Sequence, residues 1–130
     1  MHPHAFFMGL VVFVVTGLLA ADRVPPYLHE SGMRLVTECE GNMVQIATAL
    51  EMYSTDNSGR YPASLKLLVP AYLRNVPTCP SAHKDTYSSS YSCHNDPYMY
   101  TIFCRGHNHI NAGLSPNLPR YRFMGCGVAQ

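Results

Sequence analysis

The fold is decided by residues 33–57, MRLVTECEGNMVQIATALEMYSTDN, in which apolar side chains return every three or four positions. That spacing predicts an amphipathic α-helix with one apolar stripe and polar residues opposite it. At about 1.5 Å per residue, such a helix is roughly 36 Å long. Asn57-Ser58-Gly59 predicts its end, because glycine adopts the left-handed conformation at little cost. The stripe consists of Val36, Cys39, Met43, Ile46, Leu50 and Tyr53.

The sequence after this helix predicts a short helix and a small antiparallel sheet. Ser64 can cap a helix over residues 64–69, which Pro70 ends. Apolar and polar residues then alternate as they do in strands, with Asn95-Asp96-Pro97 as an intervening turn. The expected strands are residues 86–92, 98–104 and 120–124. A long helix followed by strands indicates an α+β fold, in which the helix packs on the sheet.

The N-terminal segment is the most hydrophobic part of the chain. Residues 6–21 contain no charged side chain. A membrane-spanning helix needs roughly 20 residues, so this run suits the core of an export signal or a short membrane anchor. Pro25-Pro26 is expected to break or kink a helix that arrives from this segment, and Ser31-Gly32 offers a restart. We therefore divide the chain into an anchor segment, 1–26, and a soluble domain, 27–130.

The composition of the chain excludes several classes of function. Apolar residues make up 47% of the chain, charged residues 13%, and the net charge is +1. This balance argues against a disordered tail and against a nucleic-acid binder that relies on a basic face. The sequence contains no His-Glu-x-x-His, no Gly-x-Ser-x-Gly and no glycine-rich phosphate loop. We therefore predict neither an enzyme nor a small-molecule substrate.

Five cysteines in a short chain with an export-type N-terminus favour disulfide bonds. Disulfides reinforce small cores in oxidising compartments. Because five is an odd number, at least one thiol lies outside any pairing within the chain. The sequence does not assign the pairs, although a bond such as Cys79–Cys104 would account for two of them. The candidates are Cys39, Cys79, Cys93, Cys104 and Cys126.

The same region also offers an alternative, a structural zinc site. Cysteine and histidine are the side chains that zinc prefers, and a structural site needs four of them in a tetrahedron. The spacing here is irregular and lacks the paired Cys-x2-Cys motifs of zinc ribbons, so disulfides are the simpler interpretation. The candidate zinc ligands are Cys79, His83, Cys104 and His107.

Residues 39–62, CEGNMVQIATALEMYSTDNSGRYP, resemble the type IV pilin-like and type II secretion pseudopilin superfamily. In those proteins a long amphipathic helix ends in an Asp-Asn-x-Gly-x-Tyr-Pro turn, and a leucine-rich short helix follows. Here that continuation is Leu65, Leu68, Pro70, Tyr72 and Leu73. Residues 77–80, 98–106 and 117–121 are similar to a pilin-like subgroup with a cysteine-bearing sheet. The resemblance covers roughly residues 33–125.

The resemblance implies a structural subunit of a pilin-like or pseudopilin filament or secretion assembly. Residues 6–21 would correspond to the filament-forming helix, and Ala5-Phe6 to the processing junction. The sequence departs from the family pattern at Leu10, where the family has glutamate, and in the absence of a basic leader. The implied partners are further pilin-like subunits and the membrane. The implied location is the bacterial inner membrane, with the soluble domain in the periplasm or outside the cell.

Two further features accompany this resemblance. Some pseudopilins carry calcium in a sheet loop, and Asp85, Asn95 and Asp96 offer three scattered oxygen ligands for it. Four tyrosines of the expected strands would form an aromatic face that packs against the apolar stripe of the helix. They are Tyr87, Tyr91, Tyr98 and Tyr100.

Overall fold

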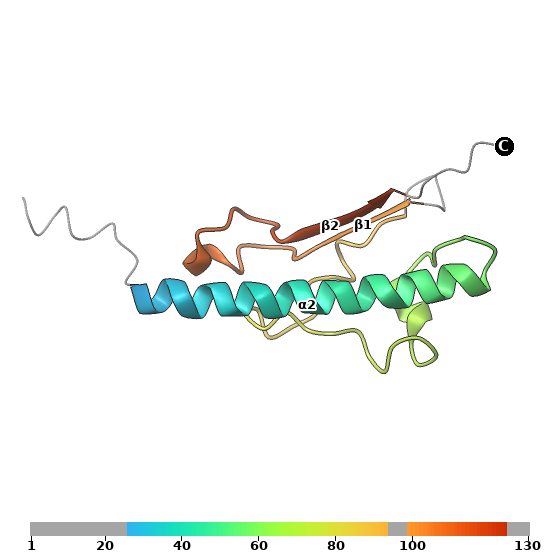
Figure 1. Ribbon diagram of the computed structural model, residues 1–130, viewed down its shortest axis with the longest axis horizontal. Helices are drawn as coiled ribbons and strands as arrows, with labels where there is room; N and C mark the ends of the chain where they lie inside the picture. Colours follow the sequence, from blue (N-terminus) through green and yellow to red (C-terminus); the bar gives the residue numbers. More distant parts are fainter. Residues whose placement is uncertain (1–25, 94–98, 125–130) are drawn as a thin grey trace, which may run out of the picture.

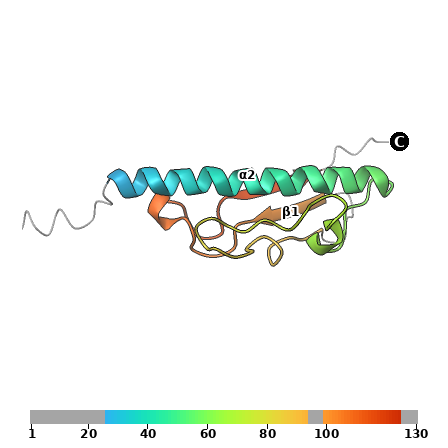
Figure 2. The same ribbon diagram turned by 90° about the horizontal axis from the view of Figure 1, so that it is seen from below.

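The computed structural model describes residues 26–93 and 99–124 (Figure 1). The fold is α+β with a long helix and a small antiparallel sheet, as the sequence predicts, but the described sheet has two strands rather than three. The long helix, α2, runs along one side of the described structure, and the other elements lie together against it (Figure 2). In chain order the elements are α2 (Pro26–Asp56), η1 (Leu65–Leu68), β1 (Met99–Phe103), η2 (Ile110–Ala112) and β2 (Arg120–Met124).

Helix α2 begins at Pro26 rather than near residue 33, so the predicted restart at Ser31-Gly32 is wrong. Proline is well tolerated in the first turn of a helix, where its missing N–H has no intrahelical acceptor to lose. The Ser31 hydroxyl donates to the carbonyl oxygen of Leu28 at 3.0 Å, as a residue inside a helix does. The other end is as expected: the helix ends at Asp56, and Gly59 takes a φ of 82°.

The apolar stripe of α2 faces the core. Val36, Cys39, Met43, Ile46 and Leu50 are buried, and Tyr53 is half-buried against them. Most of these side chains belong to one hydrophobic cluster with residues from the other elements, which attaches α2 to the rest of the domain. The partners in that cluster include Leu65 and Leu68 of η1 and Tyr100 and Ile102 of β1.

Strands β1 and β2 occupy the positions expected for residues 98–104 and 120–124. Tyr100 pairs with Phe123 and Ile102 with Tyr121. The rings of Tyr100 and Phe123 are stacked, with their centroids 5.7 Å apart. Tyr100 is buried and therefore belongs to the core, while Tyr98 lies outside the described residues.

The predicted strand 86–92 is wrong, because this stretch forms a turn with one isolated bridge, Ser92 to Thr101. The Asp85 carboxylate accepts the backbone N–H groups of Tyr87 and Ser88, each at 2.9 Å. These local side-chain bonds satisfy the backbone groups that a strand would have paired with a neighbour. The alternation of tyrosine and serine therefore does not produce a strand here.

The anchor prediction lies largely outside the described structure. No helix within residues 26–93 and 99–124 combines the length and the hydropathy needed to cross a membrane. The apolar run 6–21, the Ala5-Phe6 junction and Leu10 are not among the described residues.

Two glycines of α2, Gly32 and Gly41, differ in whether η2 lies against them, and substitutions at both test this contact. A Cβ on Gly32 would lie 2.9 Å from the backbone N of Ala112 and 2.9 Å from the carbonyl carbon of Asn111. A Cβ on Gly41 would have no neighbour within 4 Å. We expect Gly32→Ala to destabilise the domain by about 1–3 kcal/mol through overpacking. Gly41→Ala should stabilise it by roughly 0.5–1 kcal/mol, because alanine favours helix.

Urea unfolding of the two variants beside the parent chain measures this difference. Equal gains in stability from both substitutions would show that η2 does not approach α2 at Gly32.

Candidate metal centre

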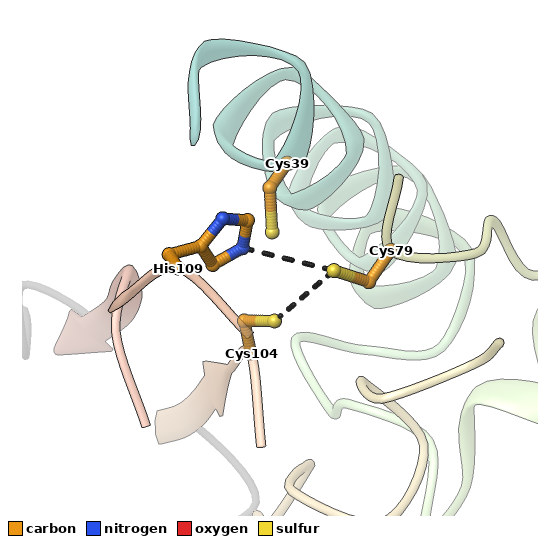
Figure 3. Close-up of side chains that lie close together, drawn as sticks. All are labelled: Cys39, Cys79, Cys104 and His109. Carbon is orange, nitrogen blue, oxygen red and sulfur yellow. Dashed lines mark hydrogen bonds between the residues drawn. The ribbon is translucent and has the colours of Figure 1, made fainter. Parts of the chain in front are cut away.

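Four side chains from separate parts of the chain converge beside α2 (Figure 3). Their candidate ligand atoms all lie within 4.8 Å of one another, and all four residues are buried. The Sγ atoms of Cys79 and Cys104 are 3.4 Å apart, and Cys79 Sγ is 3.6 Å from His109 Nε2. The four residues are Cys39, Cys79, Cys104 and His109, called the Cys3His cluster below. This cluster could hold a metal ion.

Regular structure positions two of the cysteines. Cys39 lies on the buried stripe of α2, and is fully buried there. Along β1, Tyr100 and Ile102 point into the core, and Cys104 continues this alternation one step beyond the strand. The backbone N–H of Cys104 donates to Pro119 at 3.0 Å, which holds the chain beyond β1 against the segment that enters β2.

Local turns position the other two members. A tight loop brings the N–H of Cys79 to the carbonyl oxygen of Lys84 at 2.9 Å, and the N–H of His83 back to Cys79 at 2.8 Å. His83 takes a φ of 53° to close this loop. His109 immediately precedes η2, which rests on α2 near Gly32. The close contact at Gly32 thus sets how near His109 lies to the helix.

Polar side chains outside the cluster lie within hydrogen-bonding distance of three of its members. The Cys39 sulfur is 3.1 Å from the Tyr87 hydroxyl. The Cys104 sulfur has the Thr86 hydroxyl and the Asn108 amide nitrogen at 3.3 Å each. On the far side of the imidazole, His109 Nδ1 lies 3.2 Å from the Ser81 hydroxyl oxygen. With Nε2 facing the sulfurs, a proton on Nδ1 can be donated to Ser81, the arrangement typical of metal-binding histidines.

The sulfurs differ in how readily they lose a proton. Hydrogen bonding with Cys39 lowers the pKa of the Cys104 thiol to about 4 against the effect of its burial, and Thr86 and Asn108 act in the same direction. The same Cys39–Cys104 contact, with burial, raises the pKa of Cys39. Burial raises the pKa of Cys79.

The zinc ligands expected from the sequence are only partly those of the cluster. Cys79 and Cys104 belong to it, but His83 and His107 are exposed, and the histidine of the cluster is His109. Cys39 was expected only as a stripe residue and a disulfide candidate. A cysteine at a buried helix position was the one signal in the sequence that pointed to it. No local spacing links Cys39 to the other three, because the fold alone brings them together.

The remaining candidates lie apart from the cluster. Cys39, Cys79, Cys93 and Cys104 all carry free thiols, and Cys126 lies outside the described residues. The Cys93 thiol donates to the carbonyl oxygen of Pro62 at 3.4 Å. Of the calcium candidates, Asp85 uses its carboxylate in the turn that follows it, and Asn95 and Asp96 are not among the described residues.

Comparison of the chain with protein-family models, with curated proteins and with solved structures finds no match.

Proposed function

We propose that the Cys3His cluster binds one structural zinc ion. Bonds of about 2.3 Å to sulfur and about 2.0 Å to nitrogen place tetrahedral ligands roughly 3.8 Å apart for two sulfurs and roughly 3.5 Å apart for sulfur and nitrogen. In the structure the separations are 3.4 Å for Cys79 and Cys104, and 3.6 Å for Cys79 and His109, so these two edges are within about 0.4 Å of the tetrahedral values. The convergence of four buried cysteine and histidine ligand atoms within 4.8 Å of one another is the observation that carries the proposal.

The role proposed for this zinc is structural rather than catalytic. Catalytic zinc keeps one coordination position open for water or substrate, whereas structural zinc takes four protein ligands. Here three cysteines and one histidine supply four, and all are buried. The ion would join α2 to the loop at Cys79 and to the segment 104–109 that follows β1. Such a cross-link suits a small domain, whose hydrophobic core alone provides limited stability.

Zinc accounts for more of the cluster than a disulfide does. A Cys79–Cys104 bond would use two of the three sulfurs. The buried thiol of Cys39 and the buried imidazole of His109 would lie next to this disulfide but take no part in it. A zinc ion would use all four groups. The contact between Ser81 and His109 Nδ1 would then keep Nε2 directed at the metal.

Native mass spectrometry of the full chain, purified in detergent without reductants and without chelators, tests the zinc proposal. We expect one zinc ion per chain, released by a chelator. A metal-free chain whose mass shows the hydrogen loss of S–S bond formation would replace zinc with disulfides.

A second candidate function is assembly, and it is compatible with the first. We infer that the domain is the soluble part of a pilin-like subunit, attached through residues N-terminal to α2 to a bacterial inner membrane. Two observations favour this: the resemblance of residues 39–62, and a 31-residue helix whose outer side is left uncovered. That side carries exposed apolar residues, which further subunits could cover. They are Tyr27, Met33, Val44 and Met52.

The assembly candidate makes a prediction about the N-terminus. In cells that produce the full chain with its own assembly machinery, the mature protein should begin at Phe6 and appear in filaments or in a membrane complex with pilin-like subunits. Sequencing of the mature N-terminus and electron microscopy measure these outcomes. A mature chain that begins at Asp22 would lack the proposed filament helix, and would contradict a polymerising subunit.

The outer side of α2 supplies the matched pair of variants. Val44→Glu places a charge on the exposed apolar side, while Thr48→Glu adds the same charge at a position of the same helix that is already polar and exposed. Loss of assembly in the first variant alone would support this surface as the interface.

A further inference from the structure

The hydroxyl of Tyr87 is the one tyrosine hydroxyl of the described residues that contacts the Cys3His cluster. The side chain is fully buried, in the turn that replaces the predicted strand 86–92. Its oxygen lies 3.1 Å from the Cys39 sulfur. A phenol buried in a hydrophobic core needs a hydrogen-bond partner, and a thiolate is a suitable acceptor for its proton.

Asn42 is the second hydrogen-bond partner of the Tyr87 hydroxyl. Its Nδ2 donates to the carbonyl oxygen of Thr78 at 2.9 Å and to the Tyr87 hydroxyl oxygen at 3.4 Å. Both partners accept, so the amide is held with its nitrogen toward Tyr87. A zinc-bound Cys39 thiolate has no proton to donate, so the Tyr87 hydroxyl donates to it while its oxygen accepts from Asn42. The order of donation is therefore Asn42 to Tyr87 to Cys39.

The geometry of the helix and of the turn places Asn42 and Tyr87 close to Cys39. Asn42 follows Cys39 by three positions on α2, so both side chains lie on the same side of the helix. The residue before Tyr87, Thr86, places its hydroxyl 3.3 Å from the Cys104 sulfur. Adjacent residues of one turn thus reach two different sulfurs of the cluster.

A buried zinc ion with three thiolates carries a net negative charge, since three negative ligands exceed its two positive charges. Donors aimed at the sulfurs offset that charge where water is excluded. We propose that Tyr87, oriented by Asn42, is a positioning residue of the zinc site: it holds the Cys39 thiolate toward the metal and thereby sets the affinity. This inference rests on the zinc proposal above.

The test is zinc affinity, measured on the full chain by competition with a chromophoric chelator. Tyr87→Phe keeps the ring and removes only the hydroxyl. We expect it to raise the zinc dissociation constant about 10–100-fold, as loss of an outer-shell partner does. Asn42→Ala should raise it by a smaller factor, because the hydroxyl remains but is no longer oriented. Tyr91→Phe is the control, since the Tyr91 hydroxyl donates to Pro62 and does not contact the cluster.

Cobalt substitution gives a second readout that simple loss of stability would not change. Co²⁺ in the site should show sulfur-to-metal charge-transfer absorption. Tyr87→Phe removes the hydrogen bond from the hydroxyl to the Cys39 sulfur, so it should shift that band. Tyr91→Phe should leave the band unchanged.

Each outcome has a defined meaning. If the parent chain binds no zinc, the proposed function fails and the positioning role fails with it. If the parent binds zinc and Tyr87→Phe binds it equally tightly with an unshifted cobalt band, the positioning role alone is overturned. If Tyr87→Phe does not fold, the half-exposed position 42 supplies the test. An unchanged zinc affinity in Asn42→Ala overturns the positioning role, and a raised zinc dissociation constant supports it.

Discussion

Chelating zinc from the reduced chain is expected to lower its unfolding temperature by about 10–20 °C. A ligand that binds only the folded state stabilises it by about 2.7 kcal/mol when its free concentration is roughly 100 times the dissociation constant. In a domain of this size, each kcal/mol corresponds to about 4–8 °C.

Ligand variants separate the metal from a general effect of chelators. His109→Ala should unfold at a lower temperature than the parent chain in zinc, and should no longer respond to the chelator. Cys93→Ser should keep the full zinc response, because Cys93 bonds to Pro62 and lies outside the cluster. Calorimetry or circular dichroism during heating measures all three chains under the same conditions.

An unfolding temperature that is unchanged by the chelator in a parent chain shown to hold zinc would contradict a structural role for the ion. A zinc response that His109→Ala retains in full would place the ion on other residues.

The long helix and the paired strands could be predicted because their patterns are local. The spacing of three and four in the stripe of α2 specifies a helix whatever it packs against, and Gly59 marks its end. The beginning was missed because Pro26 was expected to interrupt a helix, whereas proline at the first position starts one. The distinction depends on which residue precedes the first helical turn, and a proline pair alone does not reveal it.

The false strand at 86–92 has a different physical cause. Its alternation of tyrosine and serine is a true sequence pattern, but the Asp85 carboxylate caps two backbone N–H groups just where the strand would begin. The alternation does not reveal this turn, because the turn depends on Asp85, which precedes the alternating stretch. In this chain the turn accompanies the full burial of Tyr87, whose hydroxyl lies 3.1 Å from the Cys39 sulfur.

For the candidate metal centre, the sequence predicts the types of ligand but not which residues supply them. Cysteine and histidine in the C-terminal half pointed to zinc, and Cys79 and Cys104 were identified. Choosing His109 over His83 and His107 requires knowing that η2 rests on α2, which depends on Gly32 leaving room for the backbone of residues 111 and 112. That contact joins parts of the chain that no local pattern relates.

Leu50→Ala is expected to cost about 2–5 kcal/mol of unfolding free energy, the range for removing a large side chain from a packed core. Leu50 is 0% exposed and lies in the cluster that joins α2 to η1 and β1. Met52→Ala, two positions along the same helix, should change stability by less than about 0.5 kcal/mol. Met52 is 52% exposed, so its truncation leaves no cavity. Urea midpoints at constant slope measure both values.

The same pair of variants shows whether core and metal contribute independently. Leu50 follows Cys39 by eleven positions, or roughly 16 Å along the helix, and distant sites contribute additively to stability. Leu50→Ala should therefore cost the same amount in zinc and in chelator, and should leave zinc affinity unchanged. A cost that disappears when zinc is removed would mean that the core around Leu50 forms only after the metal has drawn the loops onto α2. A cost for Met52→Ala equal to that for Leu50→Ala would instead contradict the one-sided burial of the helix, on which both the core and the proposed assembly surface depend.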